Sequence, residues 1–311
     1  MAVDGTVSAA DVESSAVNPA NTARGIAFMM GATLMFCLAD TLMKLSAAVL
    51  PTTETMFVRS LVATLVVGAG ASYMGKLNHW RFAITHAMAV RAGSDASASL
   101  LFQSALARMP FADIMGVAQL QSLSLTAGSA LFLGEQVGWR RWSAVTVGLI
   151  GGLLIVKPGS SAFNWWAIAA VGAMMLATTR EIATRKIPAR APVPAIMVIS
   201  SAVVTMASLA GAVFQQWAAP GKSELAMMIG AGFFSLCGQF CMISSIRSAE
   251  LSVVAPFRYF AMIWALLLGY GVWQHIPDTL SLLGIAAIAA AGIYTFRREQ
   301  LLQNKRRSLT N

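Results

Sequence analysis

Long apolar runs recur along the chain from about Gly25 to Phe296, and short polar connections separate them. Most runs contain about twenty residues, which as an α-helix rising about 1.5 Å per residue cross a hydrocarbon layer about 30 Å thick. Membrane β-barrels show alternating segments of about ten residues, a different pattern. The pattern therefore predicts an all-α polytopic membrane protein with ten transmembrane helices, at residues 25–44, 54–74, 84–107, 111–133, 142–158, 164–183, 194–217, 225–246, 251–273 and 279–296.

Composition supports a lipid environment. The sequence is 57% hydrophobic and 11% charged, and a water-soluble domain of this composition could not cover its surface with polar groups. The net charge of +9 comes from basic residues between the apolar runs rather than from one basic face. We therefore expect the lipid bilayer and a small molecule as partners, and no nucleic acid.

Lysine and arginine are distributed unevenly between the two sides of a ten-helix chain. Fourteen of the 22 lie on the side of both termini, four lie on the other side, and four fall inside spans. Because cytoplasmic loops carry an excess of Lys and Arg, we expect both termini in the cytoplasm and the chain in the bacterial inner membrane. The side of the termini carries Arg24, Lys76, Arg81, Arg140, Arg141, Arg185, Lys186, Arg190, Arg247, Arg297, Arg298, Lys305, Arg306 and Arg307, and the other side carries Lys44, Arg108, Lys157 and Lys222.

The segments outside the spans are short. Residues 1–23 lack the basic start of a signal peptide and are predicted to form a flexible cytoplasmic tail, and residues 297–311 a basic cytoplasmic tail. No connection is long enough for a soluble catalytic domain. The GxxxxGK match at Gly70–Lys76 follows no strand and lacks the next Ser or Thr, so it does not indicate a phosphate-binding loop.

The spans divide into two halves of five, residues 24–158 and 164–296. The string LFLGE at 131–135 is similar to LLLGY at 266–270, which suggests an internal repeat that places position 131 on position 266. This register pairs Glu135 with Tyr270 and Gln121 with Pro256. Because five is odd, the two halves would enter the membrane from opposite sides. Inverted repeats of this kind are a recurring plan of secondary transporters.

Several segments resemble the drug/metabolite transporter superfamily, in its ten-span branch with paired EamA domains. They are FMMGATLMFCLADTLMK, the arginine of ETMFVRSLVA, FQSALARMP, SALFLGEQVGWRRWSAVTVGLIGGLLIVKPG and, in the second half, SSIRSAELSVVAPFRYFAMIWALLLGY. The resemblance implies an EamA-like repeat in residues 24–158 and another in 164–296. It also implies a central cavity between the halves that opens to each side in turn.

By this resemblance the chain is expected to be a secondary transporter of a small organic metabolite. It also resembles the flavin-importing branch, which makes riboflavin uptake the named candidate. Export of amino acids or related metabolites is the alternative. An integral membrane enzyme would need a nucleophile, an acid–base pair or a metal cluster near a membrane face, and no catalytic residue is predicted. A membrane scaffold or sensor is a further alternative.

Charges inside a membrane are costly and usually face the interior of the bundle. Asp40 and Arg59 lie at matching depths near the outer ends of the first two spans, so we predict an ion pair. The pair would either lock the two helices together or take part in gating or substrate contact.

Arg91 and Asp95 lie four residues apart on one face of the third span, a spacing that permits an intrahelical pair. Alternatively, Arg91 would contact an anionic or carbonyl-bearing substrate while Asp95 orients it. In the ninth span Arg258 and Tyr259 follow Pro256, which can kink a helix. Arg258 is the main candidate for substrate contact.

Other polar residues inside the spans are candidates as well. Gln119 and Gln121 would either join helices or line a cavity. Trp264 would stack on a planar ligand or pack in the core. Arg180 and Glu181, near the inner end of the sixth span, are predicted to reach the interface.

The sequence contains few candidate metal ligands. Cys37, Cys237 and Cys241 all lie inside apolar runs and are interpreted as buried small apolar residues. The three histidines lie near span ends and form no cluster. We therefore expect no cofactor and no metal site.

Overall fold

The computed structural model describes residues 19–73, 75, 80–133, 139–157, 164–188, 190–248 and 255–310. Over these residues all ten predicted spans contain helix and no strand occurs. The helices are α2 (Pro19–Ser46), α3 (Thr52–Tyr73), η1 (Trp80–Ala83), α4 (His86–Arg108), α5 (Phe111–Ala118), α6 (Leu120–Leu133), α7 (Trp139–Val156), α8 (Trp165–Arg185), α9 (Val193–Ala210), η2 (Gly211–Val213), α10 (Lys222–Ser248), η3 (Ala255–Tyr259), α12 (Phe260–Trp273) and α13 (Thr279–Thr310).

Some helix ends differ from the prediction. Helix α2 already begins at Pro19, and α13 continues through the basic tail to Thr310. The span predicted to reach 217 leaves the α-helical conformation after Ala210. There the chain turns back onto α3: the Gln215 side-chain oxygen accepts a hydrogen bond from Thr53 Oγ1 (2.8 Å), and the Trp217 indole donates to the same hydroxyl (3.0 Å). Apolar composition cannot reveal such a turn.

The surface of the helices suits a bilayer. Four helical segments, Ala23–Ser46, Thr52–Tyr73, Val193–Val213 and Lys222–Met242, are long and apolar enough to cross a membrane on these criteria alone. Many large apolar side chains are exposed, Leu65, Leu153 and Phe240 among them, as expected where lipid is the solvent. Helix α4 instead carries Arg91, Asp95 and Arg108, α8 carries three charged residues in its last two turns, and the span at 111–133 is broken into α5 and α6.

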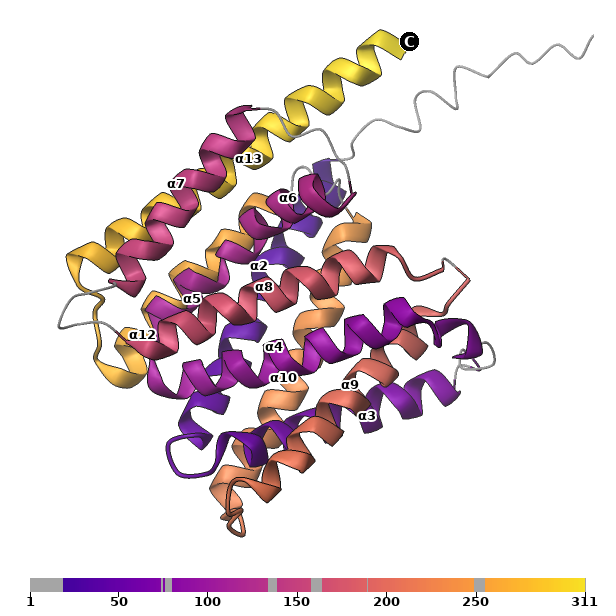
Figure 1. Cartoon of the computed structure of the whole chain (residues 1–311), viewed down its shortest axis with the longest axis vertical. Helices are drawn as coiled ribbons and strands as arrows, with labels where there is room; N and C mark the ends of the chain where they lie inside the picture. Colours follow the sequence, from indigo (N-terminus) through magenta and orange to yellow (C-terminus); the bar gives the residue numbers. More distant parts are fainter. Residues whose placement is uncertain are drawn as a thin grey trace, which may run out of the picture.

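Each helix of the first half packs against a helix of the second half. The pairs are α2 with α10, α3 with α9, α4 with α8, α5 with α12 and α7 with α13. Exchanging the two halves turns the first pair into the third and returns the pairs α3–α9 and α7–α13 to themselves. The pair α7–α13 lies at one end of the molecule and the pair α3–α9 at the other (Figure 1).

Corresponding helices of the two halves run antiparallel. In α3–α9, the Thr205 hydroxyl donates to Ser60 Oγ (3.0 Å), and Gly211 lies against Thr53. In α7–α13, Gly151 faces Gly284 across the interface. Residue numbers fall along one helix as they rise along its partner in both pairs. The two halves are therefore inverted relative to each other, as the odd number of spans predicts.

The helix ends define the register of the repeat. Helix α3 begins at Thr52 after Pro51 and α9 at Val193 after Pro192, a shift of 141 residues, and a shift of 140 in the closing helices places α12 on α6. In the closing helices Leu133 therefore corresponds to Trp273 and Trp139 to Thr279. Contacts agree, because the Gly148–Ala291 contact becomes the Gly151–Ile288 contact under the same shift.

This register differs from the one expected from LFLGE and LLLGY. His275, not Tyr270, corresponds to position 135, which itself lies outside the described residues. Pro256 likewise corresponds to Gly116 rather than to Gln121. Short leucine-rich strings recur by chance in membrane helices, so they do not fix a register.

Helices α7 and α13 approach closely because glycines remove side chains from the interface. A Cβ on Gly151 would lie 2.8 Å from the Gly284 carbonyl oxygen, and a Cβ on Gly284 would lie 2.5 Å from that of Gly151. At the end of this interface Lys157 Nζ lies 2.6 Å from Asp278 Oδ1, and this hydrogen bond lowers the pKa of Asp278 to about 2.

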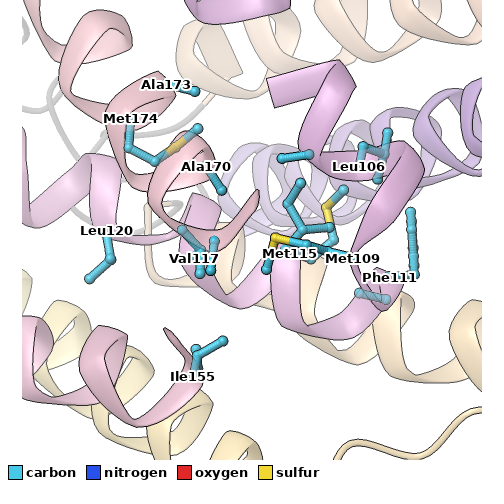
Figure 2. Packing of buried hydrophobic residues seen from close by; sticks show 14 of the residues in the cluster. Leu106, Met109, Phe111, Met115, Val117, Leu120, Ile155, Ala170, Ala173 and Met174 are labelled. Atoms are coloured by element: carbon cyan, nitrogen blue, oxygen red, sulfur yellow. The ribbon is translucent and has the colours of Figure 1, made fainter. Parts of the chain in front are cut away.

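A buried apolar core lies where α4 turns into α5 and meets α7 and α8 (Figure 2). Methionine and branched side chains fill the corner, and alanines of α8 allow that helix to approach. This core fixes α4 against α8 and so positions the polar side chains on both helices. Its members include Leu106, Met109, Phe111, Met115, Val117, Leu120, Ile155, Ala170, Ala173 and Met174.

We expect Gly284→Ala to destabilise the protein by about 1–3 kcal/mol, because the added methyl group overlaps the backbone of α7. Gly172→Ala is the matched control: Gly172 is also helical, but an added Cβ meets nothing within 4 Å. The control should change stability by less than about 1 kcal/mol and favour the helix. Thermal unfolding in detergent compares the two, and equal melting temperatures would contradict close packing at Gly284.

Candidate functional site

One ion pair lies near the outer face, defined here as the face that carries the α2–α3 connection. Arg59 Nη1 of α3 is 3.7 Å from Asp40 Oδ1 of α2, which confirms the predicted pair. The two side chains are 25% and 15% exposed, so the charges are largely removed from solvent. We call Asp40 and Arg59 the outer clasp. Helix α10 packs against both α2 and α3.

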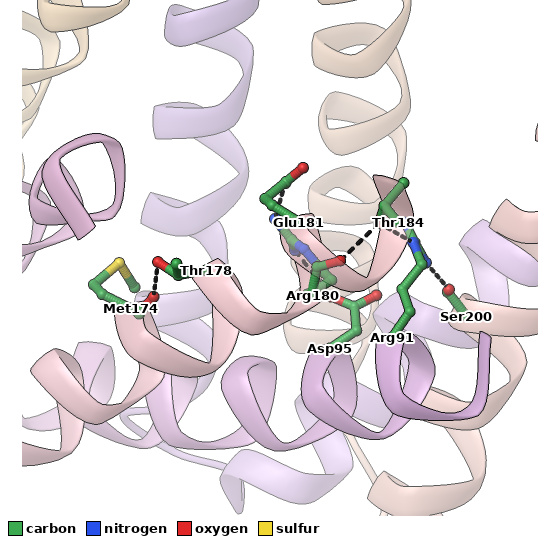
Figure 3. A network of polar contacts seen from close by, with 8 residues as sticks. All are labelled: Arg91, Asp95, Met174, Thr178, Arg180, Glu181, Thr184 and Ser200. Atoms are coloured by element: carbon green, nitrogen blue, oxygen red, sulfur yellow. Dashed lines mark hydrogen bonds and ion pairs between the residues drawn. The ribbon is translucent and has the colours of Figure 1, made fainter. Parts of the chain in front are cut away.

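A larger polar cluster lies near the inner face, where α8 ends (Figure 3). Arg180 of α8 donates to Asp95 Oδ1 of α4 at 3.0 Å and to its neighbour Glu181 at 2.8 Å. Arg91 of α4 donates through Nε to Thr184 Oγ1 at 2.9 Å and through Nη1 to Ser200 of α9. The Thr184 hydroxyl donates to the Arg180 carbonyl (2.7 Å). We call Arg91, Asp95, Arg180, Glu181, Thr184 and Ser200 the inner cluster.

The intrahelical pairing of Arg91 with Asp95 is therefore not the arrangement found. Both side chains leave α4 on the face that packs against α8, and each finds a partner across the interface. Arg180 likewise turns to Asp95 rather than to the membrane surface. The sequence held one usable signal, since charges of opposite sign occur at similar depth in the third and sixth spans. It gave no indication that these spans are neighbours.

The α-helical conformation is interrupted in the fourth span and begins from a 3-10 helix in the ninth span, at corresponding positions of the repeat that we call the helix breaks. Helix α5 ends at Ala118 and α6 begins at Leu120, so the span predicted at 111–133 is interrupted at Gln119. The 3-10 helix η3 ends at Tyr259 and α12 begins at Phe260, which corresponds to Leu120 in the register of the closing helices. The segment around Pro256, where a kink is expected, is the 3-10 helix η3. The Gln119 backbone N–H donates to the Gly116 carbonyl (3.1 Å).

The remaining predicted site residues occupy different surroundings. Arg258 is exposed, whereas Tyr259, Gln119 and Gln121 are half-buried. The Tyr259 hydroxyl fills the space that Gly292 leaves on α13. Trp264 packs against the main core, and its indole N–H is buried without a hydrogen-bond partner among the described residues.

A cavity of about 290 Å³ opens at the outer ends of α2, α5 and α12. Lys44 projects into it and donates to the Leu106 and Met109 carbonyls, each at 2.5 Å. Its ammonium group also lies 5.6 Å from the centre of the Trp273 ring. Sequence reasoning treated Lys44 only as a loop charge; its position beside a helix end was the one available signal. The lining is completed by Pro110, Phe111, Ala112, Gly269 and His275.

The cysteines are unpaired. Cys37 is buried and donates weakly to the Ala261 carbonyl (3.5 Å), while Cys237 and Cys241 are only partly buried. In the part of the chain that the structure describes, no three His, Cys, Asp or Glu side chains come together as metal ligands would. The polar groups found here can hold ions, protons or polar organic groups.

Comparison with known proteins gives one family. The sequence profile of the EamA-like transporter family matches residues 23–157 and again residues 164–297. The two matched ranges coincide with the inverted halves of the fold. One solved crystal structure has the same fold, with a TM-score of 0.61 and 18% sequence identity, and the match covers 88% of this chain and 96% of that one.

Three named relatives illustrate the range of similar proteins. The pseudopaline exporter CntI of Pseudomonas aeruginosa is 26% identical over 285 residues, which cover 89% of this chain and 97% of that protein. The riboflavin transporter of Vibrio cholerae is 27% identical over 62% of this chain and 66% of its own length. The S-adenosylmethionine uptake transporter of Rickettsia conorii is 25% identical over 57% of this chain and 60% of its own length.

We expect Asp40→Ala and Arg59→Ala each to destabilise the folded protein by about 3 kcal/mol, because each leaves a charge unpaired inside the bundle. The exchange Asp40→Arg with Arg59→Asp should restore most of the loss. Thermal unfolding of the two single variants and the exchange, in the same detergent, measures this coupling. An exchange variant as unstable as the sum of the single variants would contradict the pairing.

Proposed function

The chain belongs to the EamA-like transporter family, and from this we propose that it moves a small organic metabolite across the bacterial inner membrane by alternating access. The observation that carries the proposal is the pair of helix breaks at Gln119 and Tyr259, which the repeat relates to each other. Inverted repeats commonly build their binding sites from discontinuous helices.

The physical reason lies in the backbone. A continuous helix satisfies its own N–H and C=O groups, and in lipid nothing else can. A break frees some of these groups, which is tolerated where the chain is buried in protein or lines a wet cavity. Inversion places the Gln119 break toward the outer side and the Tyr259 break toward the inner side. A substrate between them would meet polar groups from both halves.

The side chains near the breaks are the proposed substrate contacts. Gln119, Gln121 and Tyr259 can donate and accept hydrogen bonds. Arg258 supplies a positive charge, and Trp264 supplies an aromatic face whose N–H has no partner in the described part of the chain. This set suits a planar, polar, hydrogen-bonding ligand.

Two further features complete the proposal. Arg91 and Asp95 remain candidates for substrate contact through the inner cluster. The sequence carries no nucleotide-binding motif, so the proposed energy source is a substrate or ion gradient.

Riboflavin uptake is the named candidate, and the arginine and tryptophan side chains would suit a flavin ring. The riboflavin-transporting relative matches over about two thirds of its length. Export of an amino acid or related metabolite is the second candidate. It is favoured by the relative that matches over nearly its full length, which is named an exporter. The loop distribution of Lys and Arg supports termini in the cytoplasm for either direction.

The substrate is tested by uptake of radiolabelled riboflavin into bacteria that neither make nor import it. Expression of the chain should raise accumulation well above that of the empty vector. Accumulation at the vector level would reject riboflavin uptake. Inside-out vesicles supplied with labelled amino acids then test export, and flux in purified proteoliposomes separates a carrier from a scaffold.

Arg258→Ala should lower the substrate flux at least about tenfold, because a charge-assisted hydrogen bond contributes about 1.5–3 kcal/mol. The side chain is exposed, so the amount of folded protein should not change. Arg297→Ala, at another exposed arginine on α13, is the matched control and should leave the flux unchanged. Wild-type flux in Arg258→Ala, with equal protein in the membrane, would remove Arg258 from the site.

A further inference from the structure

The opening helices of the two halves show a register that relates the outer clasp to the inner cluster. Helix α3 begins at Thr52 after Pro51, and α9 begins at Val193 after Pro192, so Thr52 corresponds to Val193. Arg59 is the eighth residue of α3, and Ser200 is the eighth residue of α9. The same shift places Gly31–Ala32 on Gly172–Ala173 in α2 and α8.

In this register Asp40 of the outer clasp corresponds to Glu181 of the inner cluster. Because the halves are inverted, the two carboxylates lie near opposite faces of the membrane. Position 59 carries an arginine, but the corresponding position 200 carries a serine. The repeat therefore has a carboxylate at both corresponding positions, 40 and 181, but an arginine only at position 59 and not at position 200.

The missing guanidinium group is supplied by another helix. Arg91 of α4 donates to Ser200, which corresponds to Arg59, and to Thr184 on α8. The partner of α4 in the repeat is α10, which carries no charged residue between Leu225 and Ile246. At the inner face the Arg91 guanidinium of α4 thus contacts Ser200, the position that corresponds to Arg59 of α3.

We propose that the outer clasp and the inner cluster are the two gates of the carrier, related by the inverted repeat, with Arg91 as the cation that completes the inner gate. The inference rests on the proposed function. Separating α4 from α8 and α9 would break the Asp95–Arg180 pair and both Arg91 contacts together. Unpaired charges in the bundle are costly, so each gate stays shut until water or substrate replaces its contacts.

The two gates are not equally tight in this structure. Asp95 and Arg180 are within hydrogen-bond distance at 3.0 Å, whereas Asp40 and Arg59 are 3.7 Å apart. The outer end of the bundle also holds the cavity beside Lys44. The inner pair is thus the closer contact, and weakening the inner cluster should shift the population of states.

Thiols placed at two corresponding positions can report which gate is open. Cys37 lies three residues before Asp40 and is 2% exposed, and Thr178 lies three residues before Glu181 and is 6% exposed. Both lie behind their gates.

The reporters are built in a common background, Cys237→Ser with Cys241→Ser. Cys37 then serves as the outer reporter, and Thr178→Cys with Cys37→Ala as the inner one. Alkylation by a membrane-impermeant maleimide is measured from each face without substrate.

We expect Asp95→Asn and Arg91→Gln to raise alkylation of the inner reporter from the inner face about tenfold and to slow alkylation of Cys37 from the outer face. Arg59→Gln should do the reverse. Asp278→Asn, which breaks an exposed pair away from both gates, is the matched control and should change neither rate. Inner-face alkylation that stays within about twofold of the parent in both Asp95→Asn and Arg91→Gln would overturn the proposal.

Two further comparisons distinguish failure of the gate proposal from failure of a variant to fold and from failure of the proposed function. If Asp95→Asn does not give folded protein, the exchange Asp95→Arg with Arg180→Asp decides: slow alkylation supports the gate, and fast alkylation or failure to fold overturns it. Alkylation needs no substrate, so it also distinguishes the two proposals. Unchanged rates with intact flux reject the gates but keep the carrier, whereas shifted rates without any flux keep the gates and reject transport.

Discussion

Charged side chains inside this low-dielectric bundle need partners of opposite charge, and this need governs much of the structure. Such a charge loses its hydration and recovers the cost only through close, well-oriented contacts. In the inner cluster Asp95 finds Arg180 across the α4–α8 interface, and Arg91 is held by two hydroxyl groups. Because these contacts join different helices, the charges also fix which helices are neighbours and at what register.

The inverted repeat relates the charged contacts at one face of the bundle to those at the other face. Helices pair across the two halves, so a feature at one face has a counterpart at the other. The counterparts are not copies. The helix breaks at Gln119 and Tyr259 correspond in position but differ in chemistry. Asp40 corresponds to Glu181, but Asp40 pairs with Arg59 of another helix, whereas Glu181 pairs with Arg180 of its own helix. A carrier built this way can have two similar end states while its substrate still meets different groups at each face.

Different interfaces of the bundle are held together by close packing and by polar contacts. The glycine-lined α7–α13 interface is held by backbone approach, which is rigid because any added atom overlaps the partner. The α4–α8 interface is held at its inner end by ion pairs and hydrogen bonds, which water can replace. The apolar corner around Met115 joins the two regions. Motion is therefore more easily accommodated at the polar interfaces than at the glycine interface.

The sequence by itself determined the helical class, the approximate spans, their division into two halves and the outer pair of Asp40 with Arg59. Span length and hydropathy reflect the thickness of the bilayer, and equal depth suffices to pair charges on consecutive helices. Only the tertiary structure decided that Arg91 and Asp95 turn away from each other, that the closing helices repeat with Leu133 on Trp273, and that Lys44 binds the end of α4. These features depend on helices far apart in sequence, and periodicity along one helix does not specify which partner it meets.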